Sequence, residues 1–143
     1  MKPRWIVCED GDEYLSRFRR FLGHEFEFFP AGDLEDVLRA ADGAAGLLLD
    51  LDFRRADPTR LVDETGTARP RIAAGERTRL AEVQGILILR ALRGRGIALP
   101  ALLCADLDDP SQGRRLEEEL KPLDVVPGNE AVARIGERLR RRG

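Results

Sequence analysis

Five short apolar runs alternate with five amphipathic segments along this chain, and this alternation limits its fold more than any other feature. The runs are continuously apolar, as in strands that are covered on both faces. The segments between them repeat apolar residues at spacings of three and four, which indicates helices. Five strand–helix units with short connections predict a doubly wound α/β fold, a five-stranded parallel sheet in the order 2-1-3-4-5.

The boundaries of these elements follow from the apolar runs and from the residues that flank them. We expect strands at about 5–8, 26–29, 46–51, 100–105 and 123–126. We expect helices at about 13–22, 34–42, 80–92, 110–120 and from 130 onward. Short polar side chains precede four of these helices and are typical N-caps; they are Asp12, Asp33, Asp109 and Asn129.

Composition excludes several classes of protein. The 143 residues, of which 43% are hydrophobic and 35% charged, suit a single globular domain spanning 1–143. Neither a membrane span nor a secretory signal is evident, so we expect a cytoplasmic protein without a membrane partner. The net charge is −2, so the protein does not have the strongly basic surface that is typical of nucleic-acid binders. Cys8 and Cys104 lie in apolar runs and are expected to be buried free thiols.

Acidic residues follow two of the expected strands. Glu9 and Asp10 come after the first strand, and Asp50 and Asp52 come at the end of the third. Ligands of such sheets bind at the carboxyl ends of the strands. Carboxylates gathered there repel one another unless a cation bridges them, and such an oxygen-rich cluster suits Mg²⁺.

Four segments, taken in order, resemble those of response-regulator receiver domains, which have the CheY-like, flavodoxin-like fold. Residues 6–10 resemble the strand that ends in an acidic pair, and 47–51 resemble the strand that carries the phosphoacceptor aspartate. Residues 84–92 look like the start of the third helix, and 100–103 resemble the run before the switch residue. The resemblance covers nearly the whole chain except about 53–79.

The resemblance implies a two-component phosphorelay, in which Asp50 accepts a phosphoryl group and Glu9, Asp10 and Asp50 hold Mg²⁺. Two positions depart from the pattern. Ala105 stands at the switch Ser/Thr, and Val126 stands at the lysine after the fifth strand. These departures favour a bacterial pseudo-receiver that acts through protein–protein interaction. Any enzymatic activity would be at most self-phosphorylation and dephosphorylation at Asp50.

Other interpretations of the same residues remain open. Arg54 or Arg55 would supply a substitute cation near Asp50. Glu9 and Asp10 would instead only favour the amino end of the first helix, and Asp52 would be a loop-capping residue. Residues 48–52 also look like the nucleophile motif of haloacid-dehalogenase-type phosphatases, with Asp50 as nucleophile and Asp52 as acid/base.

The segment at about 53–79 is added to the receiver pattern. It has seven arginines and four acids between residues 53 and 80, a net charge of +3. We expect it to dock an acidic partner or to cover the acidic crevice; the alternative is a longer third helix with a flexible, solvated lead-in.

The expected partners are a histidine kinase or a signalling effector. The resemblance places the contact face, and a possible homodimer interface, at residues 110–142.

Overall fold

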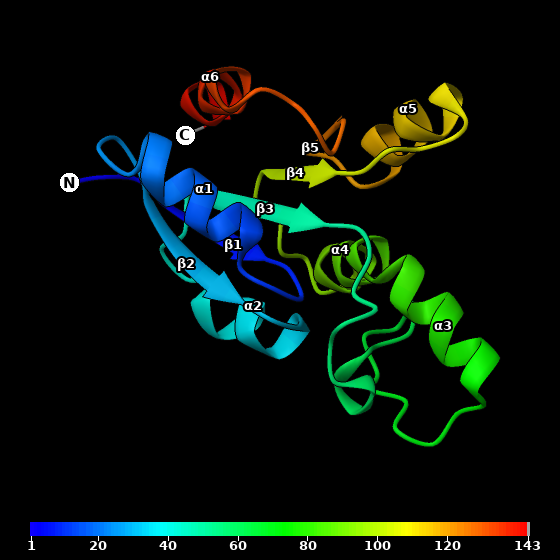
Figure 1. Ribbon diagram of the computed structural model, residues 1–143. Coiled ribbons are helices and arrows are strands. Elements are labelled where there is room, and N and C mark those ends of the chain that lie inside the picture. Colours follow the sequence, from blue (N-terminus) through cyan, green and yellow to red (C-terminus); the bar gives the residue numbers. More distant parts are fainter. Residues whose placement is uncertain (143) are drawn as a thin grey trace.

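The computed structural model describes residues 1–142, and its framework is a five-stranded sheet (Figure 1). The strands are β1 (Arg4–Cys8), β2 (Glu27–Ala31), β3 (Gly46–Asp50), β4 (Ala101–Cys104) and β5 (Leu123–Val126). They pair in the order β2-β1-β3-β4-β5, and every pair is parallel. The predicted fold class and strand order are therefore confirmed. Because all five strands run the same way, their carboxyl ends share one edge of the sheet.

Helices cover both faces of the sheet. On one face lie α1 (Glu13–Leu22) and α6 (Val132–Arg142), and on the other lie α2 (Leu34–Ala40), α4 (Gln84–Gly94) and α5 (Pro110–Glu119). Successive side chains of a strand point to opposite faces, so each strand contributes to both hydrophobic layers. Every β1 residue after the first is buried, as expected of a strand covered on both sides.

Two of the predicted helix caps are confirmed by hydrogen bonds. Asp33 accepts the backbone N–H of Asp36 at 2.8 Å before α2, and Asp109 accepts that of Ser111 at 2.9 Å before α5. Each bond pairs an N–H that the first turn of the helix cannot satisfy internally.

The prediction that Asn129 caps the last helix is wrong. Glu130 N–H donates to the Pro127 carbonyl at 3.0 Å, which places Asn129 inside a turn. The helix α6 begins only at Val132, and Ile135 N–H donates to the Ala131 carbonyl at 3.1 Å. The N-cap position therefore falls on Ala131, because the chain first closes a turn after β5.

The single helix predicted over 80–92 is instead two helices. α3 (Ala74–Glu82) and α4 meet at Val83, whose φ of −123° and ψ of 19° are not helical. The break arises because Gly85 N–H donates to the Leu51 carbonyl at 3.0 Å. α4 thus starts against the end of β3, while α3 extends away from the sheet (Figure 1).

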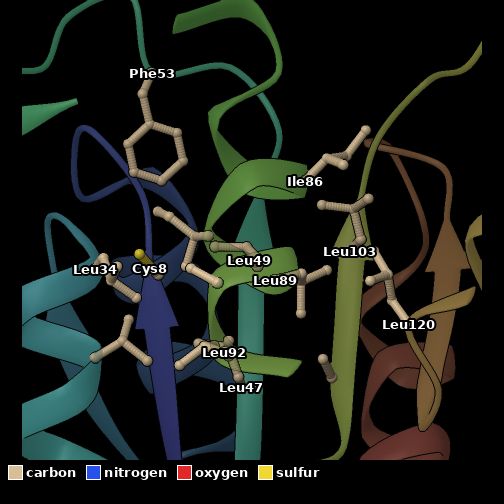
Figure 2. Packing of buried hydrophobic residues seen from close by; sticks show 14 of the residues in the cluster. Cys8, Leu34, Leu47, Leu49, Phe53, Ile86, Leu89, Leu92, Leu103 and Leu120 are labelled. Carbon is tan, nitrogen blue, oxygen red and sulfur yellow. The ribbon is translucent and has the colours of Figure 1, made fainter. Parts of the chain in front are cut away.

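The added segment is packed onto the domain. Phe53, Leu61 and Val62 are buried in the hydrophobic cluster between the sheet and α4, and Figure 2 shows Phe53 pointing toward Leu49 and Cys8. The segment also contains a short 3₁₀ helix, η1 (Pro58–Arg60), and an antiparallel bridge between residues 62 and 68. The first ten residues of the segment are therefore attached to the core through Phe53, Leu61 and Val62, while most residues between these three are exposed.

One further expectation concerns burial. Cys8 and Cys104 are buried free thiols, as predicted, and burial raises the pKa of the Cys104 thiol to about 12. Within the described residues, 1–142, no helix is both long and apolar enough to cross a bilayer.

Candidate functional site

A depression of about 250 Å³ lies at the carboxyl ends of β1 and β3. It brings together three of the predicted site residues, Glu9, Asp50 and Arg55. Its lining is mainly polar and includes both signs of charge: Glu9, Glu13, Tyr14, Arg17, Asp50, Arg55 and Gly128. The position agrees with the rule that doubly wound sheets bind ligands beside the point where the strand order reverses, here between β1 and β3.

Asp50 is the last residue of β3 and is half-buried. Its Oδ1 accepts the backbone N–H of Leu51 at 2.8 Å. Burial raises the pKa of the Asp50 carboxyl to about 6, and the negative charges of Asp10, Glu9 and Asp52 add to this rise. The strand therefore ends in a carboxyl group whose pKa lies well above that of an ordinary aspartate.

Glu9 caps α1. Its Oε1 accepts Tyr14 N–H at 3.1 Å and its Oε2 accepts Leu15 N–H at 2.9 Å, whereas Asp12, at the N-cap position, makes no side-chain cap bond. Burial raises the pKa of the Glu9 carboxyl, although these two hydrogen bonds oppose the rise. Both oxygens of Glu9 are thus used to hold the helix, which is the structural interpretation that the sequence left open.

Asp10 is paired with Arg55 from the added segment. Asp10 Oδ2 accepts the backbone N–H of Arg55 at 2.9 Å, and its Oδ1 accepts the guanidinium Nη2 at 3.0 Å. The guanidinium also reaches Glu13, with Nη1 2.5 Å from Oε1. The hydrogen bond from Arg55 lowers the pKa of Glu13 to about 2, and the two carboxylates raise the pKa of Arg55. Of the two predicted substitute cations, Arg55 is the one at the crevice.

Arg54 and Asp52 form a separate pair. Arg54 Nε lies 2.7 Å from Asp52 Oδ2, and the backbone N–H of Arg54 donates to Oδ1 at 2.9 Å. Neither residue lines the depression that contains Asp50. Asp52 therefore serves as a loop cap in this arrangement, and Arg54 does not face Asp50.

Ala105 and Val126, the two positions that depart from the receiver pattern, lie at the carboxyl-end edge of the sheet in apolar surroundings. Ala105 directly follows β4 and is 7% exposed, and Val126 ends β5 and is 1% exposed. Ala105 N–H donates to the Val126 carbonyl at 2.9 Å, which extends the pairing of the two strands. Both residues border a second hollow of about 410 Å³ between β5 and α5. Neither side chain offers a hydroxyl or an ammonium group to a ligand.

Three polar residues of the depression were not predicted from the sequence: Glu13, Tyr14 and Arg17. Arg17 and Tyr14 come from successive turns of α1, and the Arg17 guanidinium lies 5.6 Å from the Tyr14 ring centroid and 5.8 Å from that of Phe18. The Tyr14 hydroxyl donates to the Gly128 carbonyl at 3.3 Å. The i, i+3 spacing of Tyr14 and Arg17 places both on one face of the helix and is a signal that the sequence offers, but the Tyr14 ring fits the apolar stripe of the same helix equally well.

Solved structures of receiver domains match nearly the whole chain. The receiver domain of the Francisella response regulator 1452 has 14% identity and a TM-score of 0.69, over 99% of this chain and 96% of its own. The beryllofluoride-activated DrrB receiver domain has 15% identity and a TM-score of 0.64, over 99% and 97%. The beryllofluoride-activated receiver domain of Klebsiella pneumoniae RstA has 18% identity and a TM-score of 0.62, over 97% of each chain.

At these identities the likeness shows the fold, so the chain has the CheY-like fold of response-regulator receiver domains. No model of a known protein family matches the sequence, and no curated protein matches it.

The receiver fold and the acidic edge raise the question of Mg²⁺. As arranged, the residues do not fit the ion. Both oxygens of Glu9 accept backbone N–H groups, and both oxygens of Asp10 accept N–H groups of Arg55. Over residues 1–142, no three side chains of the His, Cys, Asp or Glu type are placed to hold a metal together. A guanidinium group lies where a cation would balance the carboxylates.

Proposed function

We propose that this chain is a receiver-like signalling domain that acts through protein–protein contact and does not depend on phosphorylation of Asp50. The identity of residues 105 and 126 carries the proposal. A phosphoryl group on Asp50 would need a charged or hydroxyl partner to be stabilised and sensed, and a charge-assisted hydrogen bond contributes about 1.5–3 kcal/mol. Ala105 and Val126 supply neither partner, and both are buried in apolar surroundings.

A second candidate function is a phosphorelay receiver that accepts a phosphoryl group on Asp50 from a histidine kinase, with Mg²⁺. The position of Asp50 favours it, because this carboxyl ends the central strand and lines the depression. A carboxylate nucleophile needs a cation to screen the incoming phosphoryl group. In this arrangement the nearby cations are Arg55 and Arg17.

The experiment that separates these functions uses the wild-type chain and Asp50→Asn. Each is incubated with acetyl phosphate and Mg²⁺, and separately with beryllofluoride and Mg²⁺, and is followed by intact mass and by amide chemical shifts. We expect no adduct and no shift changes around Asp50. An adduct that forms on the wild type and is absent from Asp50→Asn overturns the proposal. Turnover of a generic phosphomonoester, lost in the same variant, would instead support a phosphatase that uses Asp50 and Asp52.

We place the partner surface on the face formed by α5, β5 and α6, residues 110–142. The hollow beside β5 supports this, because Leu107, Pro110 and Val125 give it an apolar lining while Arg114 and Glu117 border it with charge. Such a mixture of an apolar centre and a charged rim is typical of protein interfaces. An acidic side chain in place of Arg114 should weaken binding through this face.

The same face is our proposed homodimer interface. Sedimentation across a range of protein concentrations is expected to show a dimer, weakened by Arg114→Glu. Arg39→Glu on α2, which packs at the opposite edge of the sheet beside β2, is the matched control, because Arg39 is an exposed arginine whose ion pairs, with Glu35 and Asp36, lie on the surface of its own helix. Equal weakening by the two variants would argue against residues 110–142 as the contact.

A further inference from the structure

The acidic edge carries its own cation. Four carboxylates, Glu9, Asp10, Glu13 and Asp50, lie around this end of the sheet, and Arg55 contacts two of them directly. The side chain of Asp10 is only 4% exposed. A carboxylate removed from water to this degree requires a partner of opposite charge. Arg55 fulfils this requirement with two separate donors to the two oxygens of Asp10.

The core holds Arg55 in position. Phe53 is buried, its N–H donates to the Ala81 carbonyl at 2.8 Å, and Ala56 N–H donates to the Phe53 carbonyl at 3.0 Å. Arg55 therefore sits in a turn that is fixed on both sides. One of its two hydrogen bonds to Asp10 comes from the Arg55 backbone. The turn already fixes the position of this N–H, so forming this bond costs little further conformational entropy.

Gly11 leaves room for the guanidinium. A Cβ atom at this position would come nearest to Glu13 Oε2 and would lie 2.7 Å from Arg55 Nη2 and 3.1 Å from its Cζ, so the glycine leaves room for both partners of the Arg55–Glu13 pair. Gly11 directly follows Asp10 in the loop between β1 and α1. The buried acid Asp10 and the glycine at position 11 thus both accommodate the guanidinium of Arg55, and the turn after Phe53 holds Arg55 beside them.

We propose that Arg55 is a built-in counter-ion that occupies the position of a divalent cation at this edge and closes Asp10 to metal. The inference rests on the proposed function, since a domain that does not use phosphorylation has no need of the metal. A divalent cation at Asp10 would meet the positive charge of the Arg55 guanidinium and would have to displace it from Asp10 Oδ1. The added segment is then the part of the chain that converts the acidic edge into a metal-free one.

The test measures Mn²⁺ binding by electron paramagnetic resonance, with Mn²⁺ as the probe of the divalent site and the full chain throughout. The variants are Arg55→Gln and, as matched control, Arg54→Gln, whose arginine pairs with Asp52 and not with Asp10. We expect wild type and Arg54→Gln to leave the signal of free Mn²⁺ unchanged up to millimolar concentration. Arg55→Gln should bind Mn²⁺ about 10- to 100-fold more tightly, the range typical of contacts to a metal ligand.

A second variant covers the case in which Arg55→Gln does not fold, as judged by circular dichroism. Arg55→Lys keeps the charge but lacks the planar fork that bridges Asp10 and Glu13, so its affinity for Mn²⁺ should lie between those of wild type and Arg55→Gln. Wild-type binding as tight as that of a folded Arg55 variant overturns the inference, as does a folded Arg55→Gln that binds no Mn²⁺. Mn²⁺ binding by the wild type without an Asp50 adduct rejects only this inference; an adduct rejects the proposed function.

Discussion

Gln84 and Val62 are joined by a reciprocal pair of hydrogen bonds. The Gln84 side-chain oxygen accepts Val62 N–H at 2.9 Å, and its amide nitrogen donates to the Val62 carbonyl at 3.1 Å. The same nitrogen donates to the Leu80 carbonyl at 3.2 Å. Gln84 is fully buried at the start of α4, so one side chain satisfies the backbone of the added segment inside the core.

Gln84→Ala should therefore lower the free energy of unfolding by about 1–3 kcal/mol, because the buried N–H and carbonyl of Val62 lose their partners. The measurement is denaturant unfolding, supported by limited proteolysis, which should cut first between residues 53 and 73. Gln112→Ala on α5 is the matched control, since Gln112 is only partly buried. Equal stability of the two variants would show that the added segment does not depend on Gln84.

Gly85 lies too close to the end of β3 for any side chain. A Cβ atom there would collide with the Asp50 carbonyl and would come within 3.1 Å of Leu51 Cα. Gly85→Ala should cost about 1–3 kcal/mol of unfolding free energy, as overpacking does in other cores.

Gly94 provides the contrast in the same helix, because a Cβ atom there meets nothing within 4 Å. Gly94→Ala should be neutral or should stabilise by up to about 1 kcal/mol through the lower entropy of the unfolded chain. Thermal unfolding of both variants tests the pair. Similar melting temperatures would mean that α4 is free to move away from β3.

Asp50 gives the protein a specific dependence on pH. Its folded pKa of about 6 lies above the ordinary value of 3.8, so the folded state binds more protons than the unfolded state between these values. Stability from this group is therefore present at low pH and is lost as pH rises from about 4 to about 6. Asp50→Asn should raise the free energy of unfolding at pH 7 by roughly 1 kcal/mol, a value reduced for the partial exposure of the group.

The gain should shrink toward zero at pH 4, where Asp50 is neutral in the wild type as well. Denaturant unfolding of wild type and Asp50→Asn at pH 4, 5, 6 and 7 provides the test. Asp52→Asn, which breaks the pair with Arg54, is the control and should give no gain at any pH. A constant difference between wild type and Asp50→Asn would contradict the raised pKa.

The Arg93 side chain links three segments: its own helix α4, the loop that follows α4 and the loop that precedes β5. Its guanidinium donates to the carbonyls of Leu120, Ile97, Leu99 and Pro122 at 2.8–2.9 Å. Arg93→Lys keeps the charge but cannot reach all four acceptors, so it should cost about 2–4 kcal/mol, given about 1 kcal/mol for each hydrogen bond.

Arg90→Lys is the matched variant one turn earlier. Arg90 pairs with Glu119 at 2.9 Å in an exposed position, and such pairs contribute at most about 1 kcal/mol. The measurement is the free energy of unfolding in urea, determined for Arg93→Lys and for Arg90→Lys. A loss of the same size at both positions would show that the four carbonyl contacts of Arg93 add nothing.

The sequence by itself determined the fold class, the strand order and the edge at which the acids gather. These follow from local patterns: continuous apolar runs such as 47–51, helical spacing after them, and the rule that parallel strands end together. It also determined that the hydroxyl and the lysine are missing at Ala105 and Val126, because residue identity requires no coordinates.

Only the tertiary structure decided which partner each charged group takes. Adjacent arginines in the sequence, Arg54 and Arg55, turn to different acids, and Glu9 and Asp10 likewise receive different donors. The reason is physical: these contacts depend on how a turn anchored by a buried Phe53 approaches the loop after β1, and neither spacing nor propensity encodes that approach. Folding places a guanidinium beside Asp10, where the sequence alone suggested a metal ion.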